Sequence, residues 1–154
     1  MIGNLQKNKI NQVVGKVRYI HSISSEHLAE AVSKRAEAKD SQESVLLEVN
    51  VSAEASKSGF SPEEVSESIQ RIVELPHISV VGLMTMAPFV EDEDVLRNCF
   101  KKLRQLRDEV KEVKLDYAPC EYLSMGMSND YKIAIEEGAT HVRIGTSLVG
   151  NELK

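Results

Sequence analysis

Short apolar runs alternate with amphipathic stretches along this chain, and that alternation limits the fold more than any other feature of the sequence. The runs at 45–51 (V-L-L-E-V-N-V) and 78–84 (I-S-V-V-G-L-M) are nearly continuous, which is typical of strands buried on both faces. Strict alternation of strands and helices predicts a parallel sheet covered by helices. The two architectures of that kind are the open doubly wound sheet and the closed eight-unit barrel.

The length of the chain narrows this choice. A closed barrel usually needs about 200 residues or more, and the sequence has 154. We therefore expect one α/β domain over 1–154, either a smaller open sheet or a barrel with units missing. Strands are predicted at 1–3, 16–22, 45–51, 78–84, 121–124 and 140–144. Helices are predicted at 5–14, at 24–38, from 61 onward, at 92–113, at 128–137 and from 146 onward.

Two of these helices carry end signals. Ser61 can cap a helix, Pro62 fits the first helical position, and Glu64 can close a capping box. Gly138 follows the predicted helix at 128–137 and is expected to end it as a C′ glycine.

Charge and composition exclude several classes of partner. The net charge is −5, with both signs interspersed, which argues against non-specific nucleic-acid binding because that needs a basic face. No apolar run is long enough to span a membrane, and residues 1–7 contain no apolar signal-peptide core, so we expect a cytoplasmic location. The cysteines Cys99 and Cys120 do not form a disulfide framework, and no histidine has metal-ligand spacing with them. We therefore expect no metal.

Two segments near the end of the chain are suited to binding an anion. In L-S-M-G-M-S-N-D at 123–130 a strand ends, Gly126 allows a tight backbone, and Ser128 can cap the next helix, whose free N–H groups favour an anion. In the second, Arg143 is followed by Gly145 and Thr146 at another helix start. Each alone has a plainer interpretation, helix capping in the first and an internal salt bridge of Arg143 in the second. Together they favour a phosphate-bearing ligand, because barrels often hold phosphate in the loops after their last two strands.

Other polar side chains are predicted at strand ends, where barrel active sites gather. These include His21 and Ser22, Asn50, and Met84 to Met86. No catalytic nucleophile is evident, since no serine lies in a G-x-S-x-G elbow and no lysine lies in an apolar strand. Lys57 is the best candidate amine, although a solvated loop lysine is the plainer interpretation.

Six motifs in order resemble one family. They are I-G-N-L-Q-K-N-K at 2–9, I-H-S at 20–22, V-N-V-S-A-E-A-S-K-S-G-F at 49–60, G-L-M-T-M-A-P at 82–88, L-S-M-G-M-S-N-D at 123–130 and R-I-G-T at 143–146. The chain thereby resembles the pyridoxal phosphate homeostasis protein family, whose members are similar to the N-terminal barrel domain of alanine racemase. The resemblance implies an eight-unit barrel that binds pyridoxal 5′-phosphate and stores or delivers it inside the cell, with no established catalytic activity.

The resemblance also implies site residues. The phosphate is expected at Gly126, Ser128, Gly145 and Thr146, and Arg143 is expected at the pyridine nitrogen. Met127, Asn50 and Met84 complete the predicted cofactor-binding set. Because arginine does not give up its proton, it keeps the pyridine nitrogen unprotonated, which limits the carbanion chemistry that the cofactor supports.

One departure from the family is large. Family members carry two more strand–helix units before the I-G-x-L-Q-x-N-K motif, and the first of those strands holds the Schiff-base lysine. Residues 1–154 therefore correspond to about strands 3–8 of a TIM-type (β/α)8 barrel. We expect weaker, non-covalent cofactor binding and self-association through open sheet edges.

Two alternatives remain open from the sequence. A racemase-like enzyme on the same barrel would need a lysine and a second acid/base residue facing the cofactor, and neither is evident. A partial barrel completed by another chain would show a mass that depends on concentration.

Overall fold

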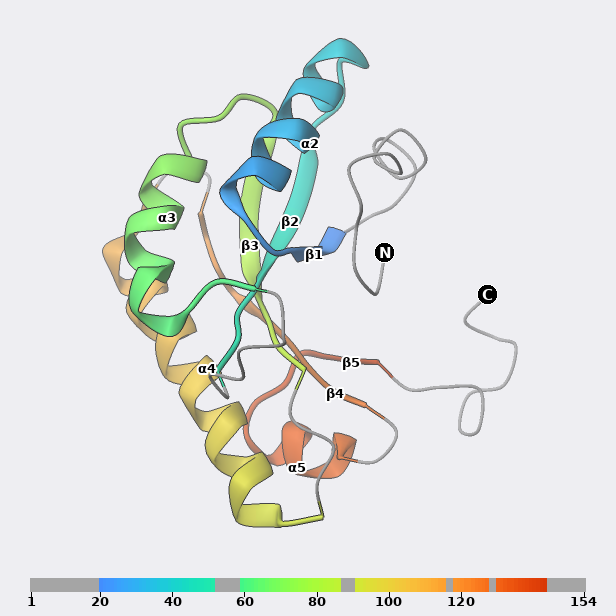
Figure 1. The fold of residues 1–154 in the computed structure, drawn as a ribbon, viewed down its shortest axis with the longest axis vertical. Helices are drawn as coiled ribbons and strands as arrows, with labels where there is room; N and C mark the ends of the chain where they lie inside the picture. The colour runs from blue at the N-terminus through green and yellow to red at the C-terminus, as the bar shows by residue number, and fades with distance from the viewer. Residues whose placement is uncertain (1–19, 52–58, 87–90, 116–117, 128–129, 144–154) are drawn as a thin grey trace, which may run out of the picture.

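Five strands alternate with helices in a parallel sheet (Figure 1). The computed structural model describes residues 20–51, 59–86, 91–115, 118–127 and 130–143. In chain order the elements are β1 (Ile20–Ile23), α2 (Glu26–Ala38), β2 (Glu43–Glu48), the 3₁₀ turn η2 (Pro62–Glu64), α3 (Val65–Ile72), β3 (Ile78–Met84), α4 (Glu93–Val113), β4 (Tyr122–Met127), α5 (Tyr131–Glu136) and β5 (His141–Arg143).

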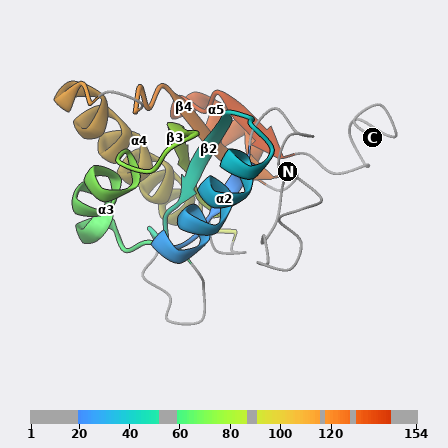
Figure 2. The ribbon, with the colours of Figure 1, turned by 90° about the horizontal axis from the view of Figure 1, so that it is seen from above.

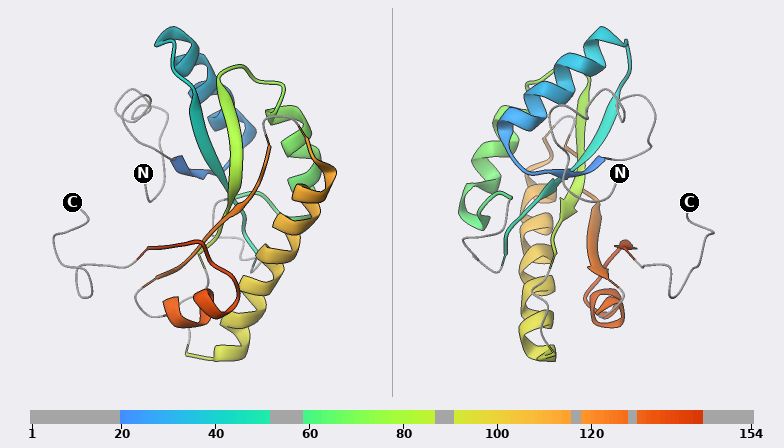
Figure 3. Two further views of the ribbon diagram at one scale, coloured as in Figure 1. Left: turned by 180° about the vertical axis from the view of Figure 1, so that it is seen from behind. Right: turned by 45° about the vertical axis from the view of Figure 1, so that its right-hand side comes forward.

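The order of the strands settles which parallel architecture this is. Neighbouring strands follow the chain, β1-β2-β3-β4-β5, and every pair is parallel. A doubly wound sheet reverses its order at a switch point, which places helices on both faces. Here right-handed crossovers always step in the same direction, so the helices collect on the same face. Figures 2 and 3 show α2, α3 and α4 on the same side of β2 and β3, as in part of a barrel wall.

The sheet buries both of its faces. On one face Val45, Leu47 and Leu83 join the helices' apolar residues, among them Phe100 and Leu103, in one core. The opposite face of the same strands carries other buried side chains, including Leu46, Glu48, Met84 and Ser124. Glu48 pairs with Met84 and Met84 with Ser124 in register, so these three share a face. That face is the one that lines the inside of a barrel.

β3 and β4 approach each other so closely at Gly82 that a side chain has no room. A Cβ atom built on Gly82 would lie 2.3 Å from the carbonyl oxygen of Tyr122, its partner in the register. Glycine at this position is therefore a requirement of the strand pairing.

The predicted strand at 78–84 and helix at 92–113 are confirmed, with Asp92 as the N-cap of α4. Ser61 N–H donates to the Glu64 carboxylate at 3.3 Å, as in the predicted capping box, although the first turn is 3₁₀. The strand predicted at 45–51 is Glu43–Glu48, because the chain beyond it pairs with Phe60. The predictions for 1–19 and for the helix from 146 fall outside the described residues, as does Lys57.

The largest correction concerns the segment after β4. The strand predicted at 121–124 extends to Met127, and the helix predicted at 128–137 begins only at Tyr131 with Asp130 as its N-cap. Ser128 is therefore not the cap of this helix. Gly138 does follow the end of α5 with a φ of +103°, as predicted.

Candidate functional site

The carboxyl ends of the five strands lie at the same edge of the sheet, because every strand pair is parallel. Glu48 of β2 is level with Met84 of β3, and Met127 of β4 is level with Arg143 of β5. The fold therefore brings Asn50, Met84, Met127 and Arg143 to this edge, as the sequence predicted. Gly145, Thr146 and Ser128 lie outside the described residues, as does the Arg143 side chain.

A chain of hydrogen bonds joins the ends of β2, β3 and β4. The Val49 N–H donates to the Met84 carbonyl oxygen at 2.8 Å, and the Thr85 hydroxyl donates back to the Val49 carbonyl oxygen at 2.7 Å. The Thr85 N–H donates to the Ser124 carbonyl oxygen at 3.1 Å. Met84, Thr85 and Ser124 are all buried. The part of the edge formed by these strands is thus a fixed framework, with the apolar side chain of Met84 buried within it.

The turn between β4 and α5 has a tight backbone. Gly126 has a φ of +102°, and a Cβ atom there would lie 2.7 Å from the Cβ of Ala134 in α5. Gly126 is therefore required by packing and by backbone conformation, whatever ligand lies beside it. This is the plain structural role that the sequence pattern left open for the segment.

The next residue in the turn is held by a carboxylate. The Met127 N–H donates to the Asp130 carboxylate at 2.6 Å, and the Asp130 N–H donates to the Met127 carbonyl oxygen at 3.1 Å. Asp130 is 5% exposed. Asp130, and not the predicted Ser128, occupies the N-cap position of α5, but its carboxylate accepts the Met127 N–H and no N–H of the helix. The Met127 N–H has an acceptor already, so an anion at this turn would take other donors.

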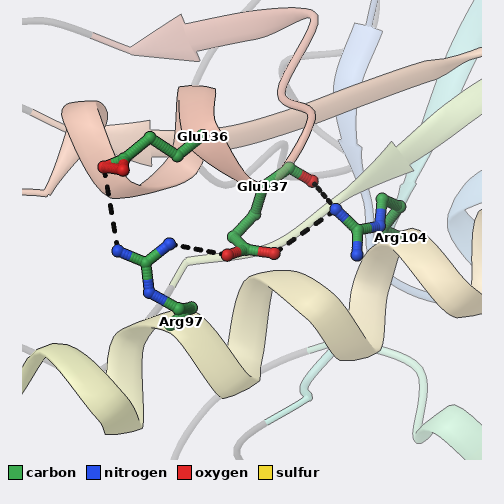
Figure 4. Close-up of polar contacts among 4 residues, drawn as sticks. All are labelled: Arg97, Arg104, Glu136 and Glu137. Atoms are coloured by element: carbon green, nitrogen blue, oxygen red, sulfur yellow. Dashed lines mark hydrogen bonds and ion pairs between the residues drawn. The ribbon is translucent and has the colours of Figure 1, made fainter.

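A buried glutamate ties α5 to α4 (Figure 4). Arg97 lies 2.7 Å from one carboxylate oxygen of Glu137, and Arg104 lies 3.3 Å from the other. Arg104 also donates to the Glu137 backbone carbonyl at 2.9 Å, and Arg97 lies 3.7 Å from Glu136. We call these four residues the Glu137 ion-pair cluster. No local pattern in the sequence indicates this cluster, because its partners come from helices far apart in the chain.

The cluster shifts the ionisation of its members. The hydrogen bond from Arg97 is the largest cause that holds the pKa of Glu137 below its usual value, with Lys101 and Arg104 adding to it against desolvation. The same hydrogen bond raises the pKa of Arg97. Both partners stay charged at neutral pH.

The two cysteines are buried and unpaired with each other. Burial raises the pKa of Cys120 to about 12, which leaves this thiol protonated and a poor nucleophile at neutral pH. Within the described ranges no group of three His, Cys, Asp or Glu side chains is placed to hold a metal ion. No helix of that part of the chain is long and apolar enough to cross a membrane.

Many known proteins are similar to this chain in sequence and in fold. The family described as "Alanine racemase, N-terminal domain" matches residues 1–152. The pyridoxal phosphate homeostasis protein of Aquifex aeolicus is 47% identical over 97% of this chain, and that of Vibrio cholerae is 36% identical over the same share. The chain spans 64% and 62% of the lengths of these two proteins.

Several solved structures have the same fold as this chain. An unknown protein from Bifidobacterium adolescentis is 44% identical, with a TM-score of 0.91 over 96% of this chain and 58% of that one. PipY of Synechococcus elongatus with bound pyridoxal phosphate is 28% identical, with a TM-score of 0.84 over 96% of this chain and 68% of PipY. Alanine racemase of Clostridium difficile shares the fold alone. It is 14% identical, with a TM-score of 0.76 over 94% of this chain and 37% of the racemase.

The strand order and the position of the helices define a partial (β/α) barrel with its polar strand ends at one edge. The chain belongs to the alanine racemase N-terminal domain family. Its similarity within that family to pyridoxal phosphate homeostasis proteins confirms the resemblance drawn from the six motifs. The doubly wound alternative is wrong.

Proposed function

We propose that this chain is part of a pyridoxal 5′-phosphate-binding protein that stores or delivers the cofactor and performs no catalysis of its own. The observation that supports this most is the 47% identity to a relative named pyridoxal phosphate homeostasis protein, over 97% of the chain. A similar protein, PipY, has been solved with pyridoxal phosphate bound. The likeness to alanine racemase at 14% identity extends to the fold alone and lends no support to racemase activity.

The residues at the strand ends fit such a ligand. Met84 and Gly126 are both buried at this edge, and the missing side chain of Gly126 lets α5 pack directly against β4, so the two residues would form the floor of the site. In this proposal Gly126, Met127, Ser128, Gly145 and Thr146 surround the phosphate.

Arg143 is the residue proposed to face the pyridine ring, with Asn50 at the rim. A guanidinium donates hydrogen bonds and keeps its own proton, so it favours the unprotonated ring nitrogen. Bound pyridoxal phosphate supplies a reactive aldehyde and an electron-withdrawing ring, and an unprotonated ring is the weaker electron sink. This is the chemical basis for proposing storage rather than catalysis. The buried thiols Cys99 and Cys120, which form no disulfide with each other, fit a reducing, cytoplasmic compartment.

The experiment that tests the proposal is a titration of pyridoxal phosphate into the purified chain, followed by borohydride reduction and intact-mass measurement. We expect saturable binding that inorganic phosphate displaces, with no covalent adduct. Pyridoxal, which lacks the phosphate, is the matched control and should bind much more weakly. A stoichiometric adduct on one lysine, with Lys57 examined first, would show that the chain carries its own covalent anchor. Absence of any phosphate-displaceable binding would reject the proposal.

A further inference from the structure

Helix α5 has little to hold it in place by apolar packing. It comprises six residues, Tyr131–Glu136, and its one fully buried side chain is Ala134. Ile135 is 54% exposed, and Ile133 is only partly buried against the core. So short a helix is not stable by itself in water, and its position must come from tertiary contacts.

The strongest polar contacts of α5 with the rest of the protein are at its carboxyl end. Glu137, its C-cap residue, is buried, with a side chain 7% exposed, and its two carboxylate oxygens face two different arginines of α4 (Figure 4). Arg104 uses one nitrogen for both the carboxylate and the Glu137 backbone carbonyl. A cation beside the last carbonyl of a helix is also favourable to the helix dipole. Arg97 and Arg104, two turns apart on α4, thus fix where α5 ends.

The opposite end of α5 rests on the turn of the proposed cofactor site. The Cβ of Ala134, in the middle of α5, lies 2.7 Å from the point where a Cβ on Gly126 would be, and Tyr131 Cα lies 3.3 Å from the same point. Asp130, directly before the helix, accepts the Met127 N–H at 2.6 Å. Any displacement of α5 therefore changes the backbone at Gly126 and Met127, because no layer of side chain separates the helix from the strand there.

We propose that Arg97 and Arg104 are positioning residues for the cofactor's phosphate, which act by holding α5 through Glu137 and so set the geometry of the Gly126–Met127 turn. This inference rests on the proposed function. It assigns a role in binding to side chains of α4 that contact the carboxyl end of α5 and not the Gly126–Met127 segment itself.

The test uses the isosteric variant Glu137→Gln in the full chain. It removes the charge that both arginines share and leaves the volume of the side chain unchanged. At a temperature where the variant is fully folded by circular dichroism, its affinity for pyridoxal phosphate should fall by about tenfold. Its affinity for pyridoxal, which lacks the phosphate, should stay unchanged. Arg97→Gln, which spares the backbone contact of Arg104, should show the same selective loss to a smaller extent.

The matched control is Glu26→Gln. Glu26 pairs with Arg71 at 2.6 Å between α2 and α3, away from α5, and its loss should alter neither affinity. A purely structural role of the cluster predicts equal losses for pyridoxal phosphate and pyridoxal, or a lower midpoint of unfolding with both affinities intact, and either result overturns the inference. If the unaltered chain binds no pyridoxal phosphate, the proposed function fails as well, and the two failures are distinguished by that measurement.

Discussion

The carboxylate of Asp130 accepts the N–H of Met127 at 2.6 Å, and the N–H of Asp130 donates to the carbonyl oxygen of Met127 at 3.1 Å. This reciprocal pair closes the turn between β4 and α5. It also places a buried negative charge beside a turn that is proposed to hold phosphate. The carboxylate stabilises the turn through its hydrogen bond but repels a phosphate electrostatically. Substitutions that remove the charge alone, or the acceptor as well, separate these two effects.

Asp130→Asn keeps an oxygen that can accept the Met127 N–H and removes the charge. We expect its affinity for pyridoxal phosphate to rise by about fivefold, the scale of one unit charge a few ångströms away in water. Asp130→Ala removes the acceptor and should lower the free energy of unfolding by about 1–3 kcal/mol. Titration and urea unfolding measure the two quantities. Weaker binding by Asp130→Asn, with the fold intact, would place the phosphate elsewhere.

Glu137 should contribute to stability in a pH-dependent way. Its pKa is lowered in the folded state, chiefly by the hydrogen bond from Arg97. A lowered pKa means that the contribution is fully present above the unfolded-state pKa of about 4.3 and is lost as the pH falls through the lower folded value. At pH 7 the free energy of unfolding of Glu137→Gln should therefore be lower than that of the unaltered protein by about 1.5–3 kcal/mol. The difference should shrink below about pH 4.3.

Urea unfolding of both proteins between neutral and acid pH measures this difference. The control is Glu26→Gln, whose ion pair with Arg71 is largely exposed and should contribute less than about 1 kcal/mol. A constant difference across the whole range would show that Glu137 acts through packing and not through its charge.

Gly82→Ala tests the close approach of β3 and β4. The added methyl group would lie 2.3 Å from the Tyr122 carbonyl oxygen, so the strands must separate. We expect a loss of about 1–3 kcal/mol in the free energy of unfolding, or failure to fold. Ser79→Ala, earlier on β3, is the matched control and should lower the free energy of unfolding by less than about 1 kcal/mol. Denaturant midpoints compare the two, and equal midpoints would contradict the structure.

Lys114→Gly should stabilise the protein. Lys114 ends α4 with a left-handed backbone, φ +56° and ψ +46°, and its side chain is exposed. Glycine adopts that conformation without the penalty of about 1 kcal/mol that other residues carry. The same substitution at the exposed helical position Glu112 should destabilise by about 1 kcal/mol. Thermal unfolding of the two variants should show shifts of opposite sign.

We expect the 154-residue chain to self-associate. It spans less than two thirds of the length of the curated relatives that it matches. Among the described strands β1 and β5 form the edges of the sheet, and open edges favour completion by another chain or by a second copy. Light scattering across a range of concentrations should give a mass above 17.1 kDa that rises with concentration. A constant monomer mass would contradict this expectation.

The sequence by itself determined the class of fold. Continuous apolar runs such as 78–84 specify buried strands, and their alternation with amphipathic stretches specifies a parallel sheet, because both signals are local and periodic. The six motifs, read in order, indicated the family that the comparisons confirm. The end of α5 at Gly138 was also a local signal, and it was predicted correctly.

The alternation of strands and helices left an open sheet and a barrel wall undecided, because strand order is a property of packing and not of any local run. The resemblance carried by the six motifs implied the barrel, and the strand order of the tertiary structure confirms it. The tertiary structure decided that Asp130 rather than Ser128 directly precedes α5, because β4 continues through Gly126 to reach its pairing with Arg143. The Glu137 ion-pair cluster joins helices that only the fold brings together, and no spacing in the sequence indicates it. Contacts between distant segments depend on how the helices lie against the sheet, and that is set by the whole core at once.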